Sequence, residues 1–144
     1  MEITHDYVDL ETAKLLKIKG FDCKVSSYYS APTEYKPELT TNRVFDNKEL
    51  ALINWNREDD FPWLFYSAPE HWAVIKWIRL KYNLHISVVT CYNNIEFTWC
   101  VRIGNKLESY MPNWEDAHYI YNDTPEEAEL EAIKYCLNNL IDGK

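Results

Sequence analysis

The chain has 144 residues, of which 15 are Lys or Arg and 23 are Asp or Glu, and its formal net charge is −8. That length suits one domain that buries a core without disulfides or metal ions. An acidic chain repels phosphate backbones and anionic membranes, so neither nucleic acid nor a membrane is an expected partner. Six Trp, eleven Tyr and five Phe exceed what a small sheet needs, and the surplus is either core or contact surface.

The first predicted element is a short helix after Asp9. Asp9 is a favourable N-cap residue, and apolar side chains recur at helical spacing through residues 10–17. Gly20 follows them and is suited to end the helix in a left-handed conformation. We expect Phe21 to fold back against this helix.

Strands, a loop and an aromatic run are predicted next. Residues 25–29 and 50–55 have the β-branched and aromatic content of short strands. The polar residues 33–47 show no period and predict a long surface loop. An acidic turn at residues 58–60 precedes residues 61–66, where aromatic side chains dominate.

A capping box, Ser67-Ala68-Pro69-Glu70, predicts the start of a second helix, because the Ser hydroxyl and the Glu carboxylate bind unpaired amides there. The helix runs to about Tyr82. Apolar side chains cover most of its circumference and leave Lys76, Arg79 and Lys81 for water. We expect it to be the central helix.

Hydrophobic alternation predicts a hairpin of residues 84–92 and 95–103 around a two-residue Asn93-Asn94 turn. This register places Val88 opposite Trp99 and gathers almost all apolar side chains on one face. The other face is mixed and partly solvated.

A third strand and a last helix complete the order. A three-residue loop aligns Leu107 with Ile103, in a meander that extends to Met111. Thr124-Pro125-Glu126-Glu127 is a second capping box, with proline in the first helical position. The helix that follows carries an apolar stripe that can cover the sheet, formed by Leu130, Ile133, Leu137, Leu140 and Ile141.

These elements predict an α+β fold in the order α-β-(β)-α-β-β-β-α. The antiparallel sheet has three strands, or four to five if residues 25–29 and 50–55 join it, with helices on one face. We interpret residues 1–144 as a single domain with a loop-rich, aromatic and acidic insert at about residues 33–66.

The four cysteines predict neither a metal site nor a disulfide. Cys23, Cys91, Cys100 and Cys136 form no C-x-x-C pair. In the predicted register, Cys91 and Cys100 lie four positions out of step, too far apart for a disulfide. We therefore expect four reduced thiols, no metal and no other cofactor.

Three blocks of sequence carry a resemblance: ETAKLLK followed by KGF, SAP followed by KWIR, and AIKYCL, within residues 11–21, 67–79 and 132–137. Their order and spacing resemble a family of short uncharacterised proteins found in Bacteroides and related gut bacteria, in their phages and in mobile elements. The blocks fall on predicted helices. The resemblance therefore implies a phage or mobile-element origin, and it brings no catalytic residue with it.

The sequence contains no catalytic signature, so we predict a non-enzymatic protein. Its histidines show no metal-ligand spacing, and three glycines are too few for a glycine-rich phosphate loop. His85, beside Cys100 and Arg102 on the mixed face, is the best catalytic candidate. An ordinary sheet surface explains these residues more simply.

Two alternatives to a protein-binding role follow from the same elements. Residues 67–141 have the helix, three strands, helix order of a double-stranded RNA-binding domain, but acidic side chains stand where that domain needs cations. A small-ligand protein would instead hold a nucleotide-like molecule in an aromatic pocket, with Lys76, Arg79 and Lys81 as clustered cations.

A protein partner explains the composition best, because exposed aromatic rings among acidic residues are the usual anatomy of an interface. We expect the chain to bind a host or phage protein in the bacterial cytosol, since no leader or membrane span is visible. The candidate binding residues are Trp55, Asp59, Asp60, Trp63, Trp114, Tyr119 and Tyr121.

Overall fold

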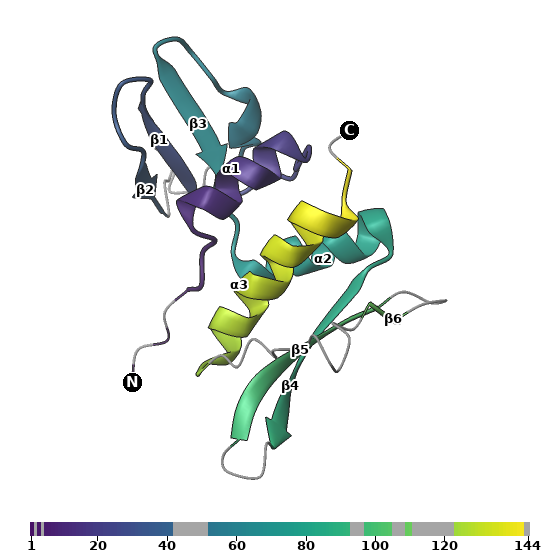
Figure 1. The fold of residues 1–144 in the computed structure, drawn as a ribbon. Helices are drawn as coiled ribbons and strands as arrows, with labels where there is room; N and C mark the ends of the chain where they lie inside the picture. Colours follow the sequence, from purple (N-terminus) through teal and green to yellow (C-terminus); the bar gives the residue numbers. More distant parts are fainter. Residues whose placement is uncertain are drawn as a thin grey trace. The chain divides into compact units, whose positions relative to one another are not determined.

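The fold is α+β, as predicted, and it is seen in a computed structural model of the chain (Figure 1). The chain divides into two compact units, residues 1–70 with 142–144, and residues 71–141. The residues that the structure describes are 1, 3, 5–41, 52–92, 97–104, 109–110 and 123–142.

The first unit contains one helix and one three-stranded sheet. The sheet order is β2-β1-β3 with both pairs antiparallel, so β1 is central. Tyr29 on β1 pairs with Leu39 on one side and with Tyr66 on the other. The elements are α1 (Leu10–Ile18), β1 (Tyr28–Pro32), β2 (Glu38–Thr40), the 3-10 turn η1 (Trp55–Arg57) and β3 (Trp63–Ser67).

Both ends of α1 form as predicted. The Asp9 carboxylate accepts a hydrogen bond from the Thr12 amide at 2.8 Å, which satisfies an unpaired N–H group at the helix start. At the other end Gly20 adopts φ 81°, and the amides of Gly20 and Phe21 donate to carbonyls of the last turn. Phe21 is buried, so the predicted fold-back is confirmed.

The two strands predicted in this unit need correction. The first begins at Tyr28 and not at Val25, because Val25 pairs only in an isolated bridge with Ile53. The second does not form in the described part of its range, where Ile53 makes that bridge and Trp55 opens η1. Residues 50–51 lie outside the described part.

The loop predicted at residues 33–47 contains β2, which pairs along the edge of β1. Its residues 42–47 are not among those described. Residues 63–67, in the aromatic run, form β3 on the other side of β1. These strands make a sheet of their own and do not extend the hairpin sheet.

The second unit contains the long hairpin and two helices. Its sheet has the order β4-β5-β6, and α3 contacts α2, β4 and β5. The elements are α2 (His71–Tyr82), β4 (His85–Tyr92), β5 (Phe97–Gly104), β6 (Ser109–Tyr110), α3 (Pro125–Tyr135) and its π-helical continuation η2 (Cys136–Leu140).

The start of α2 lies later than the capping box predicts. Ser67 is the last residue of β3, where its amide donates to the Asn56 side chain at 2.9 Å. Glu70 pairs with the N-terminal segment in an isolated bridge, and the helix begins at the next residue. Strand pairing therefore overrides the local capping signal. The predicted end at Tyr82 is confirmed, followed by Asn83 at φ 55°.

The hairpin keeps its predicted faces, but its register is wrong by two residues. Val88 pairs with Val101 and Thr90 with Trp99, because four residues separate the strands where two were expected. Side chains alternate along a strand, so an even shift leaves each residue on its predicted face. The intervening residues 93–96 are outside the described ranges.

Burial on the hairpin departs from the predicted separation of faces. On the face predicted to be apolar, Ile103 is buried and Trp99 half-buried, but Tyr92 near the loop end is exposed. On the face predicted to be solvated, Thr98 and Cys100 are buried. The polar and apolar faces are therefore less distinct than the alternation predicts.

The third strand also pairs in a different register. Ile103 pairs with Tyr110, three residues away from the predicted partner Leu107. Leu107 itself and the predicted strand end, Met111, fall outside the described residues.

The prediction of four reduced thiols is wrong. Cys100 is disulfide-bonded, whereas Cys23 and Cys136 are not. The predicted register made a disulfide impossible because it set Cys91 and Cys100 four positions out of step, and the observed register reduces this offset to two. The side chain of Cys91 is not among those described.

The last helix forms as predicted. The Thr124 hydroxyl accepts a hydrogen bond from the Glu127 amide at 3.2 Å, and proline occupies the first turn. Of the predicted apolar stripe, Ile133, Leu137 and Ile141 are buried, and Leu130 and Leu140 are partly buried.

Candidate binding surface

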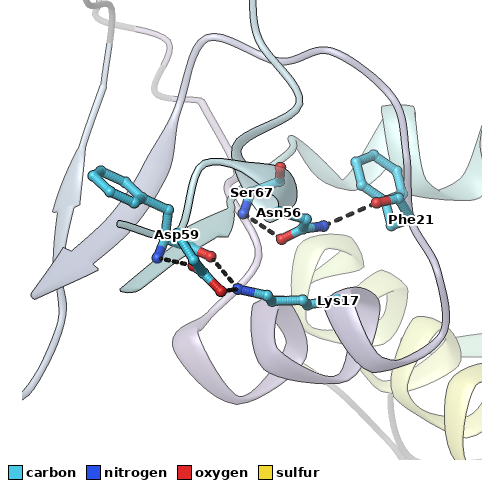
Figure 2. Close-up of polar contacts among 6 residues, drawn as sticks. Lys17, Phe21, Asn56, Asp59 and Ser67 are labelled. Atoms are coloured by element: carbon cyan, nitrogen blue, oxygen red, sulfur yellow. Dashed lines mark hydrogen bonds and ion pairs between the residues drawn. The ribbon is translucent and has the colours of Figure 1, made fainter. Parts of the chain in front are cut away.

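The outer edge of β3 is closed by side chains from the segment that precedes it. The Phe65 amide donates to Asp59 Oδ1 at 2.8 Å. The Ser67 amide donates to Asn56 Oδ1 at 2.9 Å, and Figure 2 shows this contact. The Trp63 amide donates to the Asp60 carbonyl at 2.7 Å. These three amides lie at alternate positions on an edge strand, so the segment blocks further strand pairing there.

Lys17 of α1 joins the same edge (Figure 2). Its Nζ lies 2.6 Å from Asp59 Oδ2 and donates to the Phe65 carbonyl at 2.9 Å. The ammonium group also lies 4.8 Å from the centre of the Tyr66 ring, within range of a cation–π interaction. Asp59 is thereby held in an ion pair within the chain.

Asn56 is a second cross-link. Its amide nitrogen donates to the Phe21 carbonyl at 2.9 Å, while its amide oxygen binds the Ser67 amide (Figure 2). One side chain therefore ties the end of α1 to the end of β3 through η1.

Trp55, a predicted binding residue, lies in the core, with 4% of its surface exposed. Its ring centre is 4.0 Å from that of Tyr28 and 6.1 Å from that of Phe65, and its Nε1 donates to the Val25 carbonyl at 2.8 Å. Its aromatic area and its polar nitrogen are both used inside the protein. Trp55 is therefore unavailable to a partner.

Three other aromatic side chains are exposed at one end of the sheet, and we call them the aromatic tip: Tyr35, Phe61 and Trp63. Their exposed fractions are 70%, 87% and 46%. The backbone brings them together, because Trp63 pairs with Pro32 and the Thr33 amide donates to the Pro62 carbonyl at 2.8 Å. Figure 1 shows the β1–β2 loop and the turn before β3 at the same end of the sheet.

Acidic residues adjoin the exposed rings. Glu34 precedes Tyr35 in the chain and Asp60 precedes Phe61, and both acidic residues are exposed. The segments that form the tip, residues 33–38 and 57–63, together contain five acidic and two basic residues. Within the described residues, Lys17 forms an ion pair with one of these five acidic residues, Asp59.

The structure thus places the predicted binding residues in different environments. Trp55 is core, Asp59 is an internal cross-link, and Asp60 and Trp63 are at the aromatic tip. The remaining three, Trp114, Tyr119 and Tyr121, lie outside the described residues. Sequence reasoning missed Tyr35 and Phe61; the signal for Phe61 was its place between an acidic turn and a proline.

The catalytic candidate does not assemble as predicted. His85 pairs with Gly104 in place of Arg102, and the sulfur of Cys100 is engaged in a disulfide. Burial raises the pKa of the Cys136 thiol to about 12, so that thiol is protonated and unreactive at neutral pH. Across the described ranges, no three His, Cys, Asp or Glu side chains are grouped as metal ligands.

The clustered cations proposed for a small ligand, Lys76, Arg79 and Lys81, are exposed on α2. The acidic start of α3, which argues against RNA binding, is also exposed at Glu126 and Glu127. No helix within the described residues has the length and apolar character needed to cross a bilayer.

Comparison of the chain with protein-family models, with curated proteins and with solved structures finds no significant match.

Proposed function

We propose that this chain is a non-enzymatic accessory protein of phage or mobile-element origin that binds a host or phage protein through the aromatic tip. The observation that carries the proposal is the 87% exposure of Phe61 beside the exposed Trp63 and Tyr35. Exposed large aromatic side chains are costly to leave in water and are typical of interface centres.

The surroundings of the tip support this role. The chain from η1 to the start of β3 is fixed to the sheet by hydrogen bonds from Asn56 in η1 and from Asp59 in the following turn, so Phe61 and Trp63 lie on an anchored stretch of chain. A preorganised contact surface loses less conformational entropy when a partner binds. The resemblance to phage and mobile-element proteins supports the proposed origin.

We also propose a bacterial cytosolic location. Reductants in the cytosol keep most thiols reduced. If the protein is cytosolic, its fold must therefore form without the disulfide at Cys100. A Cys100→Ser variant is expected to fold and to bind its partner as the wild type does. Failure of this variant to fold, measured by circular dichroism, would favour an oxidising compartment.

The proposal is tested by affinity capture from a lysate of the Bacteroides host, with Phe61→Ala and Trp63→Ala beside the wild type. Both variants are expected to fold and to lose a specific captured protein. Trp72→Ala is the matched control, because Trp72 is also exposed but lies on α2. Capture that is insensitive to both tip variants, or equally sensitive to Trp72→Ala, contradicts the proposal.

A further inference from the structure

We infer that the partner segment seated on the aromatic tip is cationic and rich in arginine. This inference rests on the proposed function and adds the chemistry of the partner to it. It follows from two independent features of the tip, its exposed rings and its exposed acidic side chains.

The first feature is the row of rings. On β3, Trp63 and Phe65 share a face because side chains two residues apart point the same way. Phe65 packs against Tyr28 and Trp55, so the row begins in the core and ends at the half-exposed Trp63. Phe61, which is 87% exposed, precedes this row in the turn before β3. Flat rings that are open on one side can stack with a guanidinium plane.

The second feature is the charge of the tip. Glu34 and Asp60 are exposed, and no ion pair to either carboxylate is found within the described part of the chain. Five acidic and two basic residues in the tip segments, with one acid paired to Lys17, leave a net negative charge. A carboxylate beside a ring provides the geometry for an arginine that stacks and forms an ion pair at once.

The net charge of −8 has the same sign as the tip. It therefore steers cationic segments toward the chain and opposes association of two identical copies or of an acidic partner. Arginine is favoured over lysine because its planar group both stacks on rings and binds carboxylates through two donors, whereas lysine is a more strongly hydrated point charge.

The test is a titration of the full chain with three labelled twelve-residue peptides that alternate glycine with arginine, with lysine or with glutamate. Fluorescence polarisation is expected to show the tightest binding for the arginine peptide, weaker binding for the lysine peptide and none for the glutamate peptide. Equal affinity for the arginine and lysine peptides would contradict ring stacking and overturn the inference.

Charge-matched variants separate a site from general attraction. The double variant Glu34→Gln with Asp60→Gln is expected to bind the arginine peptide at least fivefold more weakly than the wild type does. Glu126→Gln with Glu127→Gln removes the same two charges at the exposed start of α3 and is expected to change affinity less than twofold. Equal weakening by the two double variants would mean that net charge alone attracts the peptide, and the inference would be wrong.

Different experimental outcomes would refute this inference and the proposed function. If Trp63→Ala abolishes capture of a partner while the arginine peptide neither binds the tip nor competes with that partner, only the cationic assignment is wrong. If neither tip variant affects capture, the proposed function itself is wrong.

Discussion

The Asp59 carboxylate binds a backbone amide on the exposed edge of β3. Its two oxygens bind the Phe65 amide and the Lys17 ammonium, and so join β3 to α1. Backbone groups on an edge strand otherwise remain open to water or to another strand. The acidic turn therefore has a structural role at Asp59, while its exposed neighbours Glu58 and Asp60 are left for the proposed partner.

Removal of the Asp59 carboxylate is expected to destabilise the first unit. Asp59→Ala leaves the Phe65 amide to water and Lys17 without its ion pair, and it should lower the free energy of unfolding by about 1 kcal/mol. Urea denaturation followed by fluorescence measures this. Asp60→Ala is the control, with an expected change within about 0.5 kcal/mol. Equal loss in both variants would contradict the assigned role of Asp59.

The raised pKa of the Tyr29 hydroxyl predicts a loss of stability at high pH. Burial, and to a lesser degree the Asp9 carboxylate, raises the pKa of its hydroxyl, which donates to the Val8 carbonyl at 2.9 Å. The folded state then holds the proton more tightly than the unfolded state, whose tyrosine pKa is about 10. This stabilisation is full below that pH and is lost as the pH rises through the raised pKa of the folded state.

Tyr29→Phe should therefore reduce the slope of unfolding free energy against pH in the alkaline range, while it lowers stability at neutral pH by about 1 kcal/mol through loss of the hydrogen bond. Denaturation series across the alkaline range for both proteins provide the measurement. Identical slopes would show that Tyr29 ionises equally in the folded and unfolded states.

At the scale of elements, the ends of helices could be predicted where their signals were local. Asp9, Gly20 and Thr124 each act within one turn of chain, and each behaves as predicted. Ser67 has an equally good capping pattern, but pairing of β3 with β1 uses that residue in a strand. A signal read over four residues cannot compete with pairing between segments that lie far apart in the sequence.

Two left-handed positions give predictions of opposite sign. Gly20→Ala places a Cβ at φ 81° and is expected to cost about 1 to 2 kcal/mol. Asn83→Gly removes a side chain from a residue at φ 55° and should leave stability unchanged or raise it slightly. Thermal unfolding of the two variants provides the measurement. Destabilisation by Asn83→Gly equal to that of Gly20→Ala would contradict the assigned helix ends.

The hairpin shows which features of a sheet a pattern can predict. Alternation predicts the face of each residue, and an even slip of register preserves it, so the faces of Val88 and Trp99 were predictable although their pairing was not. The loop length that sets the register has no equally strong signal, and the offset between Cys91 and Cys100 depended on it. The disulfide at Cys100 was missed for that reason.

At the scale of the whole molecule, the candidate surface could be predicted only in its composition. Trp55 and Trp63 lie in the same aromatic and acidic segment, yet one is 4% exposed and the other 46%. The difference arises from packing of Trp55 against Tyr28, a contact between segments that no local pattern predicts. The sequence therefore predicted an aromatic, acidic surface in this segment but not which rings form it.

Site-specific photo-crosslinking tests the contact surface most directly. A benzoylphenylalanine at position 61 should form one discrete adduct in a lysate of the proposed host, since Phe61 is almost wholly exposed. The same group at position 72 on α2 should not form that adduct. Absence of an adduct from position 61, or the same adduct from both positions, would contradict a binding surface at the aromatic tip.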